Sequence, residues 1–206
     1  MRPYTKEISM SYAIIGLGKI GTAIAQAFAV QDIEVVVAGR RPLDAAAAQI
    51  GASLVPQRLE DAVKADVVIL AVPYATHRDI GRAAESWQGK IVIDATNAFG
   101  IPPEELGGLP STAALAKSFP GAKVVKAFNH LPAGVLAQGA RTPQGGRRVV
   151  FISSDDNAAS ASVSTLVDRL GFAPIELGKT GEGGLLIQAR GNTWAQLVFQ
   201  DLAKFD

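Results

Sequence analysis

The sequence contains no cysteine among its 206 residues and only two histidines, His77 and His130. The absence of cysteine excludes disulfide bonds, thiol nucleophiles and cysteine-ligated iron–sulfur clusters. The two histidines are far apart in the sequence, and no pair of carboxylates accompanies them at ligand spacing. The sequence therefore predicts no metal site.

The chain also lacks a strong excess of charge and any long apolar run. Its formal net charge of +1 gives no electrostatic reason to expect a nucleic acid or an anionic membrane as a partner. No apolar run approaches the about 18 residues that a membrane span requires. The first residues, MRPYTKEIS, lack the hydrophobic core of a signal peptide. We therefore expect a cytoplasmic protein with no nucleic-acid or membrane partner.

The strongest pattern lies between residues 12 and 42. A short apolar run, Tyr12–Ile15, predicts a buried strand and leads into GLGKIG, which matches G-x-G-x-x-G. Apolar residues then recur at helical spacing from Ile20 to Phe28, and a second strand is expected at Val35–Ala38. A strand, a glycine loop, a helix and a strand in this order are typical of a dinucleotide-binding unit.

Each glycine of this motif has a different expected task. Gly16 permits the tight turn out of the strand, Gly18 lets the backbone approach a pyrophosphate, and Gly21 lets the helix pack closely on the strand. The free N–H groups at the start of the helix would face the phosphates, whose charge the helix dipole favours. A glycine-rich turn in an ordinary α/β protein is the alternative, but the two flanking strands favour the dinucleotide.

The end of the second strand indicates which dinucleotide is bound. An NAD site has a carboxylate about 20 residues past the glycines, where it binds the ribose 2′-hydroxyl. Here Glu34 lies at the wrong end of the strand, and Asp44 better suits a helix N-cap. The position holds Gly39, Arg40 and Arg41, and two guanidiniums beside a small residue suit a 2′-phosphate. One arginine could instead cap a solvated loop, but the sequence favours NADP over NAD.

Strands and helices alternate along the rest of the chain, which predicts a parallel sheet covered on both faces. The expected fold is an α/β, Rossmann-like doubly wound sheet, mainly parallel, with a C-terminal helical tail. We expect one NAD(P)-binding domain over residues 1–206, with a core at 11–130 and a C-terminal α/β extension at 131–206. Further strands are expected at residues 53–55, 66–72, 90–94, 123–128, 148–153 and 172–176, and helices at 43–51, 59–65, 76–87, 111–119, 131–138, 157–170 and 183–205.

Several polar side chains follow the expected strands, where ligands of open α/β sheets bind. His130 could donate a proton or a hydrogen bond, or could only hydrogen-bond a loop carbonyl. His77 better suits the start of a helix. The amides of Asn97 and Asn129 could hold a carboxamide or a ring edge, or could stabilise their own turns.

Four segments carry a resemblance to a known family: YAIIGLGKIG, AGRRP, VIDATNAFG and LAKSFPGAKVVKAFNHLPAGVL. With these segments the chain resembles the NADPH-dependent coenzyme F420 reductase family. It is also similar to the cytoplasmic oxidoreductase domain of membrane metalloreductases with six transmembrane helices, and the segment NAF at 97–99 is closer to that pattern. The resemblance implies that NADPH lies along the strand ends and passes a hydride to a deazaflavin or flavin ring against the nicotinamide.

The resemblance and the strand ends together give the expected site. Glycine-loop residues would line the pyrophosphate, the two arginines the 2′-phosphate, and Asn97 and Phe128 would lie near the nicotinamide. The expected catalytic residues are His130 and Asn97. The expected cofactor-binding residues are Gly16, Leu17, Gly18, Lys19, Ile20, Gly39, Arg40, Arg41, Ala71, Val72, Pro73, His77, Ala95, Asn97, Phe128 and Asn129.

The leading hypothesis is an NADP-dependent oxidoreductase that transfers a hydride between NADP(H) and a diffusible flavin or deazaflavin acceptor such as coenzyme F420. Stacking of the two rings would supply most of the rate through proximity and orientation. One alternative is an NADPH-binding sensor without turnover. Another is a small-molecule dehydrogenase or imine reductase, against which the short C-terminal part argues, because it leaves no long helical domain to enclose a substrate.

The C-terminal tail is more apolar than a solvated end requires. Several of its apolar residues recur at helical spacing, so something must cover them. They could pack on the chain's own sheet, but the glycines before them favour a homodimer in which the tails pack across the interface. These residues are Ile187, Trp194, Leu197, Val198, Leu202 and Phe205.

Overall fold

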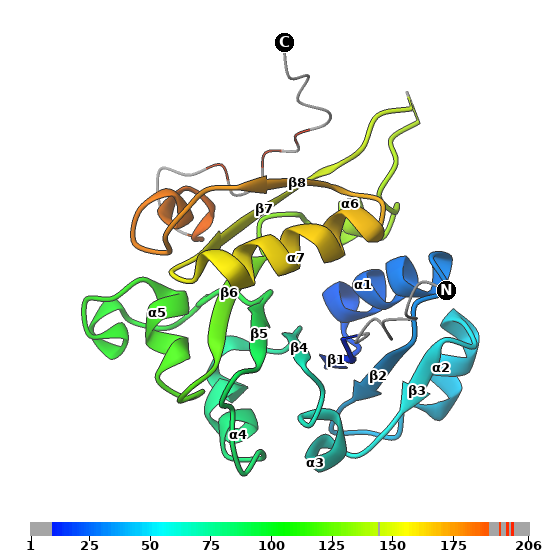
Figure 1. The fold of residues 1–206 in the computed structure, drawn as a ribbon, viewed down its shortest axis with the longest axis horizontal. Coiled ribbons are helices and arrows are strands. Elements are labelled where there is room, and N and C mark those ends of the chain that lie inside the picture. Colours follow the sequence, from blue (N-terminus) through cyan, green and yellow to red (C-terminus); the bar gives the residue numbers. More distant parts are fainter. Residues whose placement is uncertain (1–9, 144, 190–193, 195–196, 198, 200–206) are drawn as a thin grey trace, which may run out of the picture.

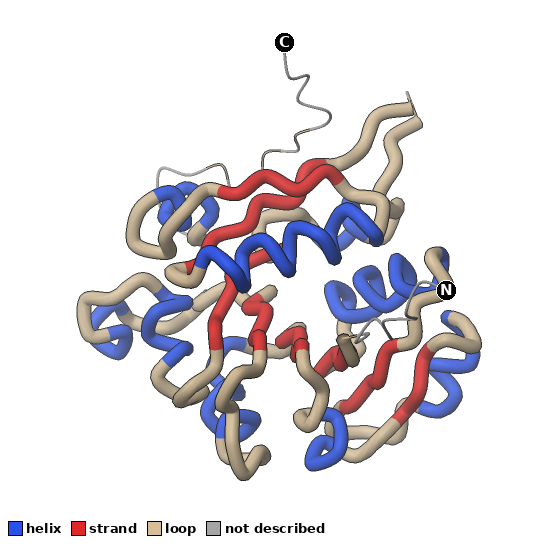
Figure 2. The backbone as a smooth tube through the Cα atoms, in the orientation of Figure 1, coloured by secondary structure: helices blue, strands red, loops and turns tan. Residues whose placement is uncertain are grey.

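The structure, a computed structural model, describes residues 10–143 and 145–189, together with residues 194, 197 and 199. In this part of the chain, eight strands form one sheet in the order β3-β2-β1-β4-β5-β6-β7-β8. Figure 2 shows how the strands change direction across the sheet, which is the twist expected of a parallel sheet. The Rossmann-like α/β fold predicted from the sequence is confirmed.

The sheet is parallel except at one junction. All pairs of neighbouring strands are parallel apart from β6 and β7, which are antiparallel. The first six strands have the order 3-2-1-4-5-6, which is that of doubly wound dinucleotide-binding sheets. The strands are β1 (Tyr12–Ile15), β2 (Val35–Ala38), β3 (Leu54–Pro56), β4 (Val67–Leu70), β5 (Ile91–Asp94), β6 (Lys123–Ala127), β7 (Val149–Ser154) and β8 (Ala173–Glu176).

Helices cover both faces of this sheet (Figure 1). Side chains of α1, α2, α6 and α7 pack against one face, and those of α3, α4 and α5 pack against the other. The α-helices are α1 (Lys19–Val30), α2 (Asp44–Ile50), α3 (Leu59–Ala62), α4 (His77–Gly81), α5 (Ser111–Ala116), α6 (Ala133–Leu136) and α7 (Asn157–Arg169). The 3₁₀ helices are η1 (Tyr74–Thr76), η2 (Pro103–Leu106) and η3 (Gly183–Ile187).

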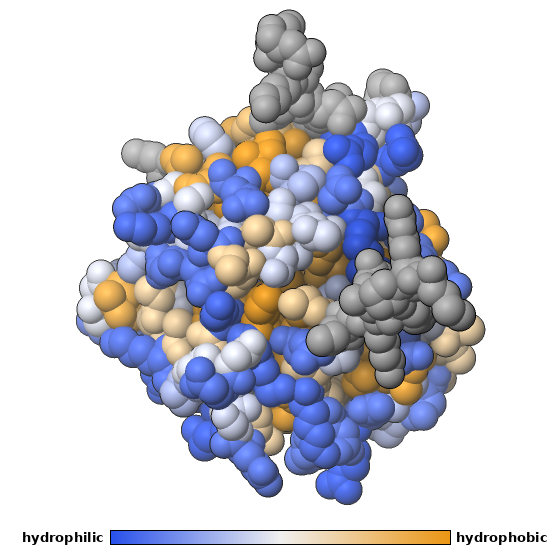
Figure 3. Space-filling model, in the orientation of Figure 1, coloured by the Kyte–Doolittle hydropathy of each residue, from blue (hydrophilic) through white to orange (hydrophobic). Residues whose placement is uncertain are grey.

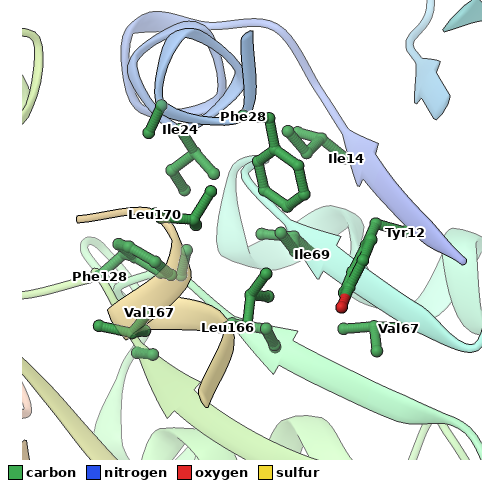
Figure 4. Close-up of a cluster of buried hydrophobic side chains, with 14 of the residues drawn as sticks. Tyr12, Ile14, Ile24, Phe28, Val67, Ile69, Phe128, Leu166, Val167 and Leu170 are labelled. Atoms are coloured by element: carbon green, nitrogen blue, oxygen red, sulfur yellow. The ribbon is translucent and has the colours of Figure 1, made fainter. Parts of the chain in front are cut away.

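The central strands are buried on both faces, as their uninterrupted apolar runs predict. Every residue of β1 and β4 is buried. Ile14 and Ile69 point to the α1 and α7 side, whereas their neighbours point to the α3 and α4 side. Figure 4 shows Ile24 and Phe28 of α1 and Leu166 and Val167 of α7 on the same side of these strands. The two longest helices therefore hold the middle of the sheet in place.

The helix expected at residues 76–87 is shorter than predicted. The turn η1 precedes α4, and α4 ends at Gly81. A Cβ at Gly81 would lie 2.2 Å from the carbonyl oxygen of Ser118, so the chain passes too close to its neighbour there for any other residue. The chain then turns so that Trp87 is buried against Phe119, and the Trp87 indole donates to the carbonyl of Gly81 at 2.8 Å. Tertiary packing therefore ends the helix early.

The helix N-cap expected at Asp44 is wrong by one residue. Asp44 and Ser111 are the first residues of α2 and α5, and neither caps its helix. The Ser111 N–H donates instead to the side chain of Gln188 at 2.8 Å, and its carbonyl accepts from the Tyr74 hydroxyl at 2.7 Å. Asp156 does cap α7, since its Oδ1 accepts from the Ala159 N–H at 2.8 Å.

The C-terminal tail is not the continuous helix that its apolar spacing predicts. Its described part forms only η3, after which Gln188 is extended, with φ −72° and ψ 129°. The Phe199 carbonyl accepts from the N–H of Val149 at 2.8 Å, and the Phe199 ring lies 5.1 Å from that of Phe151. This part of the tail packs on the chain's own sheet, which was the alternative to packing across a dimer interface. The bend expected at Gly191 and the expected positions of Val198, Leu202 and Phe205 lie outside the described residues.

Within the described ranges, no helix is long and apolar enough to cross a bilayer. The face of the molecule seen in Figure 3 is mainly hydrophilic, with smaller apolar areas between the polar side chains. No group of three or more metal-ligating side chains lies together in the same part of the chain.

Candidate functional site

The carboxyl ends of the six parallel strands β1 to β6 meet along one edge of the sheet. The strands β1 and β4 lie side by side, and the chain order runs outward from them in opposite directions, to β2 and β3 on one side and to β5 and β6 on the other. Such a reversal opens a crevice at the strand ends, which is where ligands of doubly wound sheets bind. The hydrogen bonds from Gly16 N to Ala38 O, at 2.7 Å, and from Ala71 N to Ile15 O, at 3.0 Å, hold these exits together.

The three glycines of the loop at the exit of β1 have different surroundings. Gly16 has φ +96°, and a Cβ there would lie 2.7 Å from the carbonyl oxygen of Ala71. A Cβ at Gly21 would lie only 1.8 Å from the carbonyl oxygen of Gly16, so α1 approaches the loop more closely than any side chain allows. A Cβ at Gly18 would meet nothing within 4 Å. The loop is therefore tight on the protein side and open on the side of the crevice.

The helix α1 presents its N-terminus at the same place. Gly18 is its extended N-cap residue, no side chain caps it, and its first turn carries no acidic residue. The first N–H groups of a helix have no intrahelical acceptor, and the helix dipole adds positive potential there. Lys19 is exposed beside them, whereas Leu17 and Ile20 are half-buried against the core. This end of α1 is suited to an anion such as a pyrophosphate.

Two arginines follow β2 at the neighbouring exit. Arg40 and Arg41 are both exposed, and neither forms an ion pair or a side-chain hydrogen bond with the described residues. Gly39 precedes them, and a Cβ there would lie 3.3 Å from a methyl group of Leu43. The two guanidiniums are therefore available to a ligand at this corner of the crevice.

The exit of β4 lies between the glycine loop and α4. Ala71 and Val72 are half-buried there, and Pro73 is exposed. His77 begins α4, as its sequence context suggested, and its side chain is buried. Its Nδ1 lies 2.5 Å from the carbonyl oxygen of Tyr74, so one ring nitrogen is already used within the fold.

The exits of β5 and β6 are joined by their two asparagines. Nδ2 of Asn97 donates to the carbonyl of Asn129 at 2.8 Å, and Nδ2 of Asn129 donates to Oδ1 of Asn97 at 3.1 Å. Asn129 also donates to the carbonyl of Ile187 at 2.7 Å, which ties η3 to the same place. Phe128 is fully buried and has φ +63°, and Ala95 is buried beneath the exit of β5. The two amides thus join the neighbouring exits to each other.

The structure shows a buried ion pair at these two exits that the sequence analysis did not predict. Nζ of Lys126 lies 3.2 Å from Oδ2 of Asp94, and both side chains are almost fully buried. Burial raises the pKa of Asp94, but the Lys126 ammonium and the hydroxyls of Thr112 and Thr96 outweigh it, so the pKa lies below its usual range. The sequence held a signal for this pair, because Asp94 and Lys126 each place a charge in or at the end of an apolar strand. Only the pairing of β5 with β6 shows that the two residues are partners.

His130 lies behind the strand exits in a buried position. Its Nε2 is 3.3 Å from the carbonyl oxygen of Val149, and its ring centroid lies 5.0 Å from that of Phe151. Nδ1 has no hydrogen-bond partner among the described residues. Burial lowers the pKa of His130 to about 4, although the bond to Val149 acts in the opposite direction. The side chain is therefore a neutral imidazole at physiological pH, and its hydrogen bond is to a backbone carbonyl.

This burial predicts a pH dependence of stability. The folded pKa of about 4 lies below the unfolded value of about 6.5, so the unfolded state binds a proton first as the pH falls. The contribution to stability is complete above about pH 6.5 and is lost between there and about pH 4. We expect the H130Q variant, which cannot charge, to lose about 2 kcal/mol less than the unmodified protein between about pH 7 and pH 4.5. Urea unfolding at both values measures the difference, and equal losses would contradict it.

The fold and the site define a dinucleotide-binding protein of the oxidoreductase type. The family model described as "NADP oxidoreductase coenzyme F420-dependent" matches residues 11–98. Residues 11–98, which carry the glycine loop and the two arginines, thus match a family of NADP-dependent oxidoreductases.

Three proteins of similar sequence or structure extend the comparison. The chain is 31% identical over 166 residues to Metalloreductase STEAP3 from Rattus norvegicus, a match that covers 80% of this chain and 33% of that protein. The chain thus spans about a third of the length of this curated relative. A hypothetical protein from Sinorhizobium meliloti has a similar structure, with a TM-score of 0.85, 42% identity and coverage of 94% of this chain and 96% of that one. A candidate F420-dependent NADP-reductase from Arthrobacter has a TM-score of 0.67, 28% identity and coverage of 85% and 89%.

Proposed function

We propose that this protein is an NADPH-dependent reductase that transfers a hydride to a diffusible flavin or deazaflavin ring. The observation that carries the proposal is the crevice itself. Of its three glycines only Gly18 faces open space, and Arg40 and Arg41 form no ion pair with the described residues at the adjoining strand exit. A pyrophosphate at the loop and a 2′-phosphate at the arginines would complete both features, and NADPH carries both groups.

The residues of the crevice fit the cofactor from end to end. Arg40 and Arg41 would bind the 2′-phosphate, and the N–H groups around Lys19 would bind the pyrophosphate. Ala71 and Val72, which are half-buried, and Pro73, which is exposed, would lie along the middle of the cofactor. Asn97 and the backbone at Phe128 would border the nicotinamide. When bound, NADPH supplies the hydride and its two electrons to the reaction.

The acceptor side of the crevice suits a flat ring. Phe99, two residues after Asn97, is an exposed aromatic side chain, with 64% of its surface accessible. The 3₁₀ helix η3 lies across the exit of β6, and its Leu185 is also exposed. In the part of the chain that the structure describes, no long helix encloses this end of the site. An apolar ring could therefore stack between these side chains and the nicotinamide end, whereas a small polar substrate would stay in contact with water.

In this reaction the chain orients the two rings and excludes water from between them. Held at the exits of β5 and β6, the bound nicotinamide would supply the hydride from its C4–H bond, and the hydride would form a new bond to the acceptor ring. The oxidised nicotinamide remains, and the reduced acceptor takes one proton from solvent. His130 is buried and neutral, so we do not assign it a proton transfer, and Asn97 acts by holding the ring edge. Proximity and orientation then supply most of the acceleration.

The experiment that tests this function compares acceptors. Purified protein is mixed with NADPH and, in separate reactions, with FMN, FAD, coenzyme F420 or cyclohexanone, and the absorbance of the reduced nicotinamide is followed. We expect turnover with at least one of the three ring acceptors and none with cyclohexanone. Tight NADPH binding without turnover would support the sensor, and turnover with cyclohexanone alone would support the small-molecule dehydrogenase.

We also propose that the protein is a homodimer, with the C-terminal tail contributing to the interface. Trp194 and Leu197 stay exposed, at 37% and 51%, although Phe199 packs on the sheet. Removing residues 191–206 is expected to give monomers that still bind NADPH through the glycine loop but no longer transfer hydride. Light scattering and NADPH titration measure the two effects. A monomeric intact protein at micromolar concentration, or full activity after the truncation, would contradict this proposal.

A further inference from the structure

Two charged side chains lie inside the sheet at a place where apolar residues would also fold. Asp94 ends β5 and Lys126 lies beside it in β6, where their Cα atoms are register partners. Their side chains are 0% and 3% exposed. Taking two charges out of water costs several kcal/mol per ion, and replacing such a pair by apolar residues is often neutral or stabilising. A contribution to stability alone therefore does not explain why the chain has a charged pair at this position.

Most hydrogen bonds of the pair lead to one residue at the exit of β5. Oδ1 of Asp94 accepts from the N–H and the hydroxyl of Thr96, at 2.9 and 2.6 Å. Nζ of Lys126 donates to the carbonyl of Thr96 at 3.3 Å. The remaining oxygen, Oδ2 of Asp94, accepts from the hydroxyl of Thr112 in α5 at 2.6 Å. Thr96 is thus fixed at its N–H, its hydroxyl and its carbonyl, and Asn97 follows it directly.

The second exit is fixed through Asn97. The side chain of Asn97 exchanges hydrogen bonds with the backbone and the side chain of Asn129. Between Lys126 and Asn129 lies Phe128, whose φ of +63° is unfavourable for a bulky side chain. Such a conformation costs about 1–3 kcal/mol and persists only where the surroundings determine it, most often at functional sites. Lys126 of the ion pair lies two residues before this turn, in the strand that leads into it.

We infer that Asp94 and Lys126 are positioning residues that hold Asn97 and the Phe128 turn in the geometry needed for hydride transfer. This inference rests on the proposed function, which places the nicotinamide at these two exits. Neither residue touches the ligand, because both lie under the exits. They act on the chemical step through Thr96 and Asn97, and they have no part in holding the phosphates, which bind at the exits of β1 and β2.

The test uses a double variant, Asp94→Asn with Lys126→Met, which keeps the sizes of both side chains and leaves no unpaired buried charge. We expect its dissociation constant for NADPH to stay within about threefold of the unmodified value, while kcat falls by about 10- to 100-fold. The matched control is Arg148→Met. It removes another buried cation, 4% exposed, whose bonds go to Gly139, Arg141 and Gln138 instead of the strand exits. This control is expected to lower stability and to leave kcat within about twofold.

A second readout needs no acceptor. The fluorescence of bound NADPH reports the surroundings of its reduced ring, and we expect the double variant to change it while Arg148→Met does not. A folded double variant with unchanged kcat and unchanged fluorescence would overturn the inference. If the unmodified protein reduces no acceptor, the proposed function fails, and the fluorescence alone decides the inference. If the double variant does not fold, Thr96→Val replaces it, since it removes one hydrogen bond and no charge. Unchanged NADPH fluorescence in the Thr96→Val variant would also overturn the inference.

Discussion

Replacing Arg40 and Arg41 together by alanine is expected to remove most of the preference for NADPH over NADH. Both guanidiniums are exposed at the exit of β2 and carry no ion pair with the described residues, so nothing in the fold competes with a 2′-phosphate for them. Charge-assisted hydrogen bonds are worth about 1.5–3 kcal/mol each, or about 10- to 100-fold in affinity per effective contact. NADH lacks the 2′-phosphate, so its affinity should change little.

The measurement is a titration of both cofactors by fluorescence, for each single variant and for the double variant. The single variants show whether one arginine or both act, since either could merely border the loop. Arg58→Ala is the matched control, because Arg58 is also an exposed arginine, and among the described residues its ion pair is with Glu60 alone, at 3.5 Å. Equal affinities for NADPH and NADH in the unmodified protein would refute the NADP assignment.

Replacing Gly21 by alanine is expected to lower the stability of the protein, whereas replacing Gly18 by alanine is expected to weaken NADPH binding. A Cβ at Gly21 would lie 1.8 Å from the carbonyl oxygen of Gly16, so α1 or the strand exit must move. Overpacking of this kind costs about 1–3 kcal/mol and sometimes more, and a backbone contact this short belongs at the upper end. We therefore expect the melting temperature to fall by about 6–12 °C, the shift that about 3 kcal/mol produces in a chain of this size.

Gly18 is the matched control in the same loop. Nothing lies within 4 Å of the position of its Cβ, and its φ of −76° is allowed for alanine. Gly18→Ala should keep the melting temperature within about 2 °C of the unmodified value, since surface changes of this kind cost about 0.5 kcal/mol or less. Its methyl group would stand where the pyrophosphate approaches, so NADPH should bind at least about tenfold more weakly. Unchanged NADPH affinity in this variant would mean that the cofactor does not bind at this loop.

Local patterns predicted the half of the site to which we assign the phosphates. The glycine spacing, the apolar strand before it and the helical stripe after it lie within about 30 residues, and such a unit has one common way to fold. The arginines could be assigned because a parallel strand brings its following residues to the same edge as the glycine loop. Sequence proximity was therefore enough for Gly16, Gly18, Gly21, Arg40 and Arg41 to be placed together.

The other half of the site depends on contacts between distant segments. Asp94 and Lys126 are 32 residues apart, and only the register of β5 with β6 makes them a pair. The bonds from Asn129 to Ile187 and from Ser111 to Gln188 join segments 58 and 77 residues apart. The sequence also could not show that His130 turns inward, because the β6 exit bends at Phe128 through a positive φ. Packing of remote elements decides these features, and no local pattern encodes them.

Transfer of deuterium from NADPH labelled at C4 to a 5-deazaflavin tests the central claim most directly. A deazaflavin has the flat shape of a flavin but accepts the hydride at carbon, and deuterium on carbon does not exchange with water. Each of the two stereoisomers of the labelled cofactor is mixed with the protein and the deazaflavin, and the reduced product is analysed by mass spectrometry. Stacked rings in a fixed site predict one deuterium atom in the product from one stereoisomer and none from the other. A deazaflavin that stays oxidised, or a reduced product without deuterium from either stereoisomer, would contradict hydride transfer in this crevice.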